Sequence, residues 1–519
     1  MADRTQPLSL VGAGKAASAA LLVVILGALL AVAATGTSTL WLGPSDWAAL
    51  RFTVLQAVLS AAISVLLAIP LARALIRRRF PLYGLAITLL GAPFLLPVLV
   101  AVLGVLAVFG RNGLISQMMM SIGLPPIEIY GLQGVVLTHV FFNLPLATRL
   151  ILQGWLSIPS EQVRLGHALG FGPSEAAQHL ERPVLQAVLP GAFLVIFLIC
   201  STSFAVALTM GGGPRATTLE LAIYQAFRFE FDLSRAAALG AVQVALCAVA
   251  VLAIRMVPTA PDGFGGLDAT RLQLPKGGKW VRAQDIAVLL LGLGFLLFPI
   301  LMILVRGLPF VGNLPDTIWM AALRSLCVAI VSVSIMLVLA LPIATTLARV
   351  PTGWPHFAAA LPIAVSPLVL GLGAFVGLRP WIDPGSVVLP LTAFVNAVMS
   401  LPFVLRSLVP ELRKVDAHHG RLAVALGMSR SNWMRLIVLP RLRRALGFGA
   451  GLTAALSMGD LGVIALFGSA DRGTLPLAIY QLMGSYQMDA AAGAALVLMA
   501  LTLCIFWIFD RGGRFNAAV

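Results

Sequence analysis

Charged residues are scarce in this sequence. Only 11% of its 519 residues are charged, 60% are hydrophobic, and the mean hydropathy is +0.99. A soluble globular protein is about one quarter charged. A core of this chain length could not bury so much apolar surface, so a water-soluble fold is excluded. The chain is therefore expected to cross a lipid bilayer many times.

Cysteine pairs, metal-ligand clusters and phosphate-binding loops are also missing. The four cysteines lie inside apolar runs without paired spacing, which excludes a disulfide framework. The adjacent His418 and His419 have no third ligand in register, so we predict no metal site. No G-x4-G-K-[ST] segment occurs, so the chain cannot be an ATPase on its own and is expected to bind no cofactor.

The positive charges that are present, with a net charge of +15, gather in alternate short loops. Nucleic-acid binding needs one contiguous basic face, so it is not expected. The alternation follows the positive-inside rule and predicts that three loops and both termini are cytoplasmic. These loops carry Arg73, Arg77, Arg78 and Arg79; Arg255, Arg271, Lys276, Lys279 and Arg282; and Arg413, Lys414, Arg421, Arg430, Arg435, Arg441, Arg443 and Arg444.

Twelve apolar runs are long enough to cross the hydrocarbon as helices. They are continuous rather than alternating, which favours helices over a barrel and predicts an all-α polytopic membrane protein. The first run could be a cleaved signal peptide, but its length favours a retained helix. The predicted spans are 16–36, 52–76, 82–109, 131–152, 184–209, 236–257, 284–306, 320–348, 354–378, 388–409, 441–466 and 488–510.

The chain repeats itself across a Pro- and Gly-rich segment at residues 258–283, which has the composition of a linker. Residues 1–257 and 284–519 each hold six spans, so the two halves are predicted to be parallel repeats. Thr218 to Gln225 corresponds to Thr474 to Gln481 at an offset of 256 residues. Pro97 and Pro367 are 270 residues apart, which places an insertion in the first half near residues 110–130.

A polar loop between spans is the clearest repeated feature, at residues 155–183 and 410–440. In each copy a glycine precedes a proline by thirteen positions: Gly170 with Pro183, and Gly427 with Pro440. The pattern predicts a short helix, a glycine that ends it in the left-handed conformation, and a second short helix. We call these two loops the elbows. Two equivalent elbows predict two docking points for a partner, whereas a plain connecting loop has no reason to keep its spacing.

The elbows resemble the E-A-A-x-x-x-G-x9-I-x-L-P pattern of permease subunits in binding-protein-dependent ABC importers. The second copy matches at Gly427, Ile437, Leu439 and Pro440, and the first keeps Gly170 and Pro183. In the family the Glu supports docking to the ATPase. Both copies depart at the Glu-Ala-Ala, which reads Arg164-Leu165-Gly166 and Arg421-Leu422-Ala423.

Within this family the fused halves are similar to the permeases for thiamine and thiamine pyrophosphate. The segments that carry this likeness are Gly211 to Gln225, Gly459 to Gly468, and Thr474 to Gln481. The resemblance implies the type I importer permease fold and a bacterial inner-membrane location. It also implies two copies of a separate cytoplasmic ATPase, which use ATP and Mg²⁺, and a periplasmic substrate-binding protein.

The translocation path is expected near Asp460, an acid close to the end of a span, whose repeat counterpart is Ser203. With aromatic faces such as Phe204, Tyr224 or Tyr480 it could attract the thiazolium cation of thiamine. A gate or helix-capping role for the acid is the alternative.

Two other functions stay open from the sequence. A ferric-iron importer would have the same architecture but would favour several oxygen or nitrogen ligands near the path. A secondary transporter would need paired intramembrane charges and would not need two matched elbows.

Overall fold

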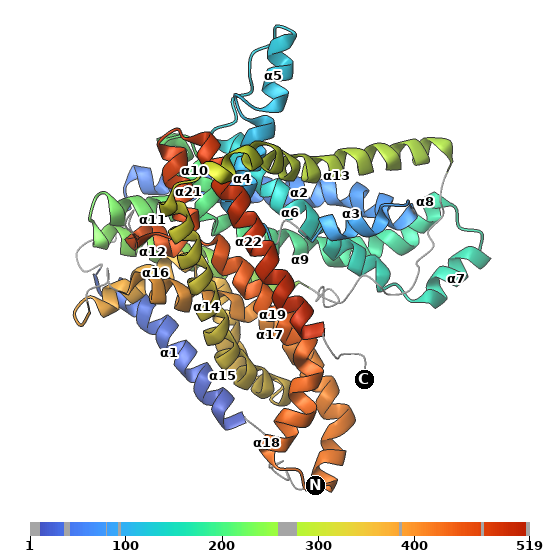
Figure 1. Cartoon of the computed structure of the whole chain (residues 1–519). Helices are drawn as coiled ribbons and strands as arrows, with labels where there is room; N and C mark the ends of the chain where they lie inside the picture. The colour runs from blue at the N-terminus through green and yellow to red at the C-terminus, as the bar shows by residue number, and fades with distance from the viewer. Residues whose placement is uncertain are drawn as a thin grey trace. The chain divides into compact units, whose positions relative to one another are not determined.

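The computed structural model describes residues 11–35, 42–78, 80–91, 95–257, 278–382, 387–468 and 472–514 (Figure 1). Every regular element in these ranges is helical, so the predicted all-α membrane fold is confirmed. Most of the predicted linker lies outside the described residues. Its last part does not belong to a linker, because helix α13 already begins at Lys279.

Within the described ranges, eleven helical stretches are long and apolar enough to cross a membrane, and one bent pair of helices brings the number to twelve. The single predicted span 354–378 is that bent pair, α15 and α16, with an angle of 102° between them. The bend follows from Pro367, because a residue that precedes proline is driven to an extended conformation, as Ser366 is at ψ 151°. The predicted span 82–109 is likewise interrupted, and α3 and α4 take its place.

The helices of the first half, in chain order, are α1 Val11–Thr35, α2 Pro44–Arg77, α3 Tyr83–Leu89, α4 Val98–Phe109, α5 Leu114–Ser121, α6 Leu132–Leu156, α7 Ser160–Ala168, α8 Pro173–Ala176, the π-helix η2 Ala177–Glu181, α9 Arg182–Ser201, α10 Phe204–Met210, α11 Leu219–Arg228 and α12 Leu233–Met256. Helix α5 lies in the segment where the insertion was predicted.

The helices of the second half are α13 Lys279–Gly307, α14 Asp316–Arg349, α15 Trp354–Ala364, α16 Pro367–Leu378, α17 Val388–Ala425, α18 Arg430–Asn432, the π-helix η6 Trp433–Val438, α19 Leu439–Gly459, α20 Gly462–Phe467, α21 Leu475–Gly484 and α22 Met488–Arg514. Helices α2 and α14 are both 34 residues long and carry a proline at the same place, Pro70 and Pro342.

The same tether holds α11 beside α2 and α21 beside α14. The Thr53 hydroxyl accepts a hydrogen bond of 2.8 Å from the backbone N–H of Leu219. At the corresponding position of the second half, the Ser325 hydroxyl accepts one of 2.8 Å from the N–H of Leu475. A short helix N-terminus buried in an apolar setting needs a partner for its free N–H groups, and a hydroxyl on the neighbouring long helix supplies it in both halves.

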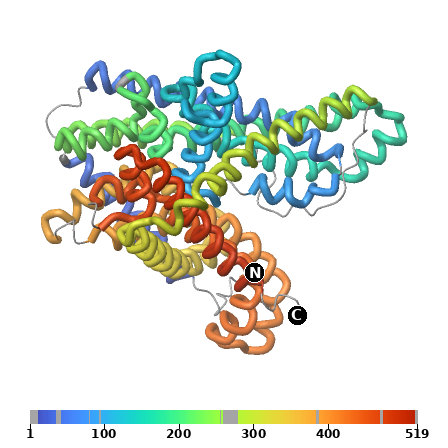
Figure 2. The backbone as a smooth tube through the Cα atoms, turned by 45° about the horizontal axis from the view of Figure 1, so that its top comes forward, coloured from blue at the N-terminus to red at the C-terminus, as the bar shows by residue number. Residues whose placement is uncertain are grey.

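Contacts divide the chain into two compact units that are not consecutive in sequence. One unit contains α1, residues 224–244 and everything from residue 310 onward, and the other contains residues 41–223 and 245–309. Helix α1 packs against α14, α15 and α16, whereas α13 packs against α2, α3 and α4 (Figures 1 and 2). The first helix of each sequence half therefore belongs to the unit built from the other half. The division into halves at residues 257 and 284 stays a prediction about the sequence repeat.

A glycine allows the close approach of α1 to α16. A Cβ atom on Gly373 would lie 2.2 Å from the backbone oxygen of Ala28, so no other residue fits there without moving one helix. Helix α1 therefore packs at one specific position on α16.

Candidate functional site

The two elbows have the same backbone geometry. Gly170 and Gly427 adopt φ angles of +72° and +61°, the left-handed conformation predicted for them. The following residues close the helix in the same way: the N–H of Phe171 donates to the oxygen of Gly166 at 2.9 Å, and that of Met428 to Ala423 at 3.0 Å. This six-to-one bond is the Schellman motif, so both elbows turn on an identical cap.

The Glu-Ala-Ala positions of the elbows separate into exposed and buried residues. Gly166 and Ala423 are buried, and a Cβ on Gly166 would lie 3.0 Å from the Phe171 ring. Only a small residue fits at this third position. Arg164 and Arg421 at the first position are exposed. Arg164 forms an ion pair with Glu161 at 3.1 Å, and the two side chains are 75% and 74% exposed.

An exposed pair of leucines stands on each elbow. Leu165 is 61% exposed and Leu169, one turn further on, 64%. At the corresponding positions of the second elbow, Leu422 is 56% exposed and Leu426 is 68% exposed. Leucines four residues apart lie on one helix face. Leu165 and Leu422 were predicted site residues. Leu169 and Leu426 were not, although their repeat spacing was visible in the sequence.

Each elbow has a first leg before its glycine and a second leg after it. The second leg differs from the prediction in both elbows. No separate second short helix forms, because the chain continues from α8 through η2 into α9, and from α18 through η6 into α19. The π-turns Ala177–Glu181 and Trp433–Val438 end just before Pro183 and Pro440. Proline lacks an N–H and crowds the preceding turn, and a wider π-turn accommodates it without ending the helix.

The first legs also differ from each other. In the first copy the chain leaves α6 at Leu156 and starts α7 after Pro159. In the second copy α17 runs on without a break to Ala425, so its first leg is not a separate short helix as predicted. The residue at the position of Pro159 is Asp416, which keeps its N–H and lets the helix continue.

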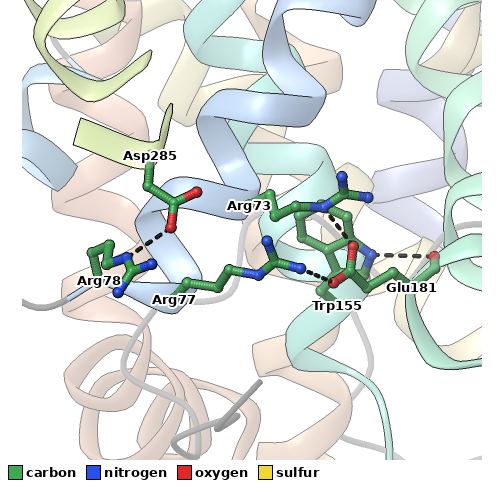
Figure 3. A network of polar contacts seen from close by, with 6 residues as sticks. All are labelled: Arg73, Arg77, Arg78, Trp155, Glu181 and Asp285. Carbon is green, nitrogen blue, oxygen red and sulfur yellow. Dashed lines mark hydrogen bonds and ion pairs between the residues drawn. The ribbon is translucent and has the colours of Figure 1, made fainter. Parts of the chain in front are cut away.

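A buried carboxylate fixes the first elbow to α2 (Figure 3). Glu181, at the end of η2, is fully buried and pairs with Arg73 at 2.6 Å and Arg77 at 3.2 Å. The Trp155 indole N–H of α6 donates to the Glu181 backbone oxygen at 3.3 Å. A buried charge is costly unless it is paired and hydrogen-bonded. The second leg of the elbow is therefore held to two long helices at one point.

The other unit fixes its elbow helix by a related pair. Arg349, which ends α14 at the position of Arg77 in α2, contacts Asp416 of α17 through two hydrogen bonds of 2.8 and 3.1 Å. Two parallel bonds between a guanidinium and a carboxylate fix orientation as well as distance. The anchoring arginine is the same in both halves, but the acid comes from the second leg of one elbow and the first leg of the other.

Asp460 and Ser203 lie at equivalent breaks in the membrane helices. Asp460 separates α19 from α20 and Ser203 precedes α10, and both have extended ψ angles, 128° and 99°. The Asp460 Oδ1 accepts a hydrogen bond of 3.0 Å from the N–H of Gly462, so the acid satisfies the first free N–H of α20. Its Oδ2 is buried and makes no close hydrogen bond among the described residues, although the Asn396 side chain lies near the carboxyl group.

Just before these breaks, each unit carries a buried polar group. In one unit the Ser457 hydroxyl contacts Ser332 Oγ at 2.9 Å and accepts a bond from Asn396 at 3.2 Å. The repeat positions in the other unit are Cys200, Ser60 and His139. There, His139 Nδ1 lies 3.4 Å from the Ser60 hydroxyl. These six residues were not predicted, because a single serine or asparagine inside an apolar run looks the same as a packing residue.

The remaining predicted path residues are distributed over the two units. Phe204 begins α10 and is 6% exposed, and it belongs with Ser203 to one unit. Tyr224 is 7% exposed, Tyr480 is half-buried, and both belong with Asp460 to the other unit. The grouping of these five residues around a substrate stays a prediction.

Comparison with known proteins gives clear relatives over nearly the whole chain. A thiamine transport system permease protein of Brucella abortus is 40% identical over 476 residues, which cover 90% of this chain and 87% of the relative. The corresponding protein of Salmonella typhimurium is 36% identical over 536 residues, 98% of each chain. A more distant relative, a sulfate transport system permease protein of Escherichia coli, is 29% identical over 43% of this chain and 84% of its own.

No protein-family model matches the chain. The curated relatives nevertheless cover both sequence halves, the two elbows and the helix breaks. Their level of identity over almost the full length agrees with the resemblance drawn from the elbows and from the Gly211 to Gln225 segment. The chain therefore belongs to the family of thiamine transport system permease proteins, and it is a multi-pass membrane protein of a transport system.

Proposed function

We propose that this chain is the membrane subunit of an ATP-driven importer that moves thiamine, or its phosphates, across the bacterial inner membrane. The named function of its relatives supports the substrate. The duplicated elbows, each with an exposed pair of leucines on one face, support two docking points for a cytoplasmic ATPase. A periplasmic binding protein would deliver the substrate on the opposite side, and ATP and Mg²⁺ would be used by the ATPase alone.

The exposed leucines are the observation that carries the docking role. An apolar side chain more than half exposed, repeated at the same place on two polar loops, lowers its free energy when a partner covers it. The third position of the motif is small because it is buried, so the contact surface consists of the first and second positions and the leucine one turn later. Arg164 and Arg421 would form the polar rim of that surface in place of the family's Glu.

The elbows can pass force to the membrane helices through the ion pairs described above. When two ATPases close, the elbows would be drawn together. Glu181 would carry the motion to α2 through Arg73 and Arg77, and Asp416 would carry it to α14 through Arg349. Rigid rocking of this kind would open the path toward the binding protein. With the elbows in the cytoplasm, the positive-inside distribution of charge supports a cytoplasmic location for both termini as well.

The docking role is tested with Leu169→Ser and Leu426→Ser, separately and together, in the chain co-expressed with its ATPase. Each single change is expected to weaken co-purification of the ATPase, and the double change to abolish it. Met118→Ser on α5 is the matched control, because Met118 is also 63% exposed but lies away from the elbows. Undiminished co-purification of the double variant would contradict the docking role.

A further inference from the structure

Three phenylalanines form a closed aromatic cluster within one compact unit. The rings of Phe375 and Phe467 stack, with centroids 4.5 Å apart and planes 4° from parallel. Phe227 meets both rings edge-on, at 5.2 Å from Phe375 and 5.4 Å from Phe467. All three side chains are half-buried, so part of the surface of the cluster is exposed. We call these three residues the aromatic cluster.

The cluster lies at the end of its unit that is remote from the elbow. Phe375 is near the last turn of α16, after which α17 starts at Val388 and runs 38 residues to the elbow. At 1.5 Å per residue this is about 57 Å, more than the thickness of a bilayer. With the elbow in the cytoplasm, the cluster is on the side where a binding protein would release substrate.

The sequence repeat shows that the fold does not require these rings. Phe375, Phe467 and Phe227 correspond to Val105, Met210 and Met483 in the repeat. Helices α4 and α10 pack against each other in their unit as α16 and α20 do in theirs. The aliphatic residues therefore support the same helix packing, and the aromatic rings need another explanation.

A second feature of the same unit points to a cation. Asp460, at the opposite end of α20 from Phe467, corresponds to Ser203 in the repeat. Its Oδ1 accepts a hydrogen bond from the N–H of Gly462, and its Oδ2 is buried without a close hydrogen bond among the described residues, although the Asn396 side chain lies near the carboxyl group. Helix α20 thus carries an aromatic face at one end and a carboxylate oxygen without a close hydrogen bond at the other, about 10 Å apart along a helix of this length.

We propose that the aromatic cluster is the entry site for a flat, positively charged heteroaromatic ring, which packs on the exposed part of the cluster while Asp460 supplies the counter-charge further along the path. The inference rests on the proposed function, in which the substrate is thiamine with its thiazolium cation. Aromatic faces attract such cations through their negative quadrupole, and stacking with offset rings is favourable in its own right. The site belongs to one unit only, so the two halves of the transporter are not equivalent toward the substrate.

The test replaces each phenylalanine by the residue that the repeat carries, in the complete transporter in proteoliposomes. The variants are Phe375→Val, Phe467→Met and Phe227→Met, singly and combined. The combined variant is expected to raise the KM for thiamine uptake about tenfold, with kcat within about twofold, because the site acts on entry. An analogue whose cationic ring is replaced by a neutral one is expected to compete poorly against thiamine in the wild type and less poorly in the variant, which keeps only the counter-charge of Asp460.

Phe448 and Phe506 provide the matched control. They form an edge-to-face pair in the same unit, with centroids 6.1 Å apart, and are also half-buried. Phe448→Met with Phe506→Met is expected to leave KM and the discrimination between charged and neutral rings unchanged. If the combined cluster variant does not assemble with the ATPase, Phe467→Met alone is compared in its place, because it removes one face of the stack.

The outcomes separate this inference from the function on which it rests. Wild-type transporter that accumulates thiamine, with cluster variants of unchanged KM and unchanged discrimination, would overturn the inference and leave the function standing. Wild-type transporter that does not accumulate thiamine would overturn both. A rise in KM in the cluster variants and not in the control pair would support the inference.

Discussion

At the scale of single residues, charges are used sparingly and differ sharply in environment. Glu181 is fully buried between two arginines, whereas Glu161 lies on the exposed elbow helix beside Arg164. The pKa of the exposed Glu161 carboxyl is lowered, chiefly by its own backbone N–H and then by Ser160 and Arg164. Of the two acids, only the buried Glu181 is expected to matter for stability.

Glu181→Gln is predicted to destabilise the protein by about 3–5 kcal/mol, because it leaves two partly buried arginines without a counter-charge. Glu161→Gln, in an exposed pair, is predicted to leave stability unchanged. Thermal unfolding of the two purified variants in detergent measures the difference. Equal midpoints for both variants would show that the buried pair does not hold the elbow to α2.

At the scale of elements, the two elbows show which local structures can be predicted from the sequence and which cannot. Gly170 and Gly427 were predicted to end helices in the left-handed conformation, and both do so. The helix start at Pro173 was correctly predicted, but the helix does not end before Pro183, because a proline in the sequence indicates a new helix as readily as a π-turn within a continuous one. The unbroken α17 was missed for a similar reason: the two copies were assumed to break at the same place, although Pro159 of the first copy is replaced by Asp416 in the second.

Gly427→Val is predicted to cost about 1–2 kcal/mol at the elbow cap, because a branched residue is strained at φ +61°. The cap would open and ATPase co-purification would fall, while the membrane helices stay folded. Gly427→Asn should retain docking, since asparagine tolerates this conformation. Gly420→Ala is the control, because Gly420 lies inside α17 with open space at its Cβ. Normal docking by the valine variant would contradict the role of the cap.

At the scale of the whole molecule, the repeat could be predicted from the sequence. The sequence did not predict that the first helix of each half packs in the unit built from the other half. Offsets between matching prolines reveal which segments correspond. They carry no information on which helix packs against which, because the long apolar stretches of α1 and α13, residues 19–34 and 286–305, have no polar face that would orient them. The close contact of Gly373 with Ala28 becomes visible only in the structure. The aromatic cluster was missed in the same way, since its rings come from three separate helices.

A chain cut between Val257 and Gly278 is predicted to remain assembled. Helix α1 of the first fragment packs with α14, α15 and α16 of the second, and α13 of the second packs with α2 and α4 of the first. Co-expression of the two fragments, with an affinity tag on one, should recover both in equal amounts. A tag that recovers only its own fragment would show that the exchanged helices do not hold the protein together.

The central claim is that this chain, with its ATPase and binding protein, imports thiamine by the movement of two equivalent elbows. The most direct measurement is uptake of radiolabelled thiamine into proteoliposomes that contain the chain and its ATPase, with ATP inside and the binding protein outside. We predict accumulation that requires ATP and the binding protein and that is lost with Leu169→Ser and Leu426→Ser together. Uptake that persists without ATPase, driven by an ion gradient, would contradict the claim.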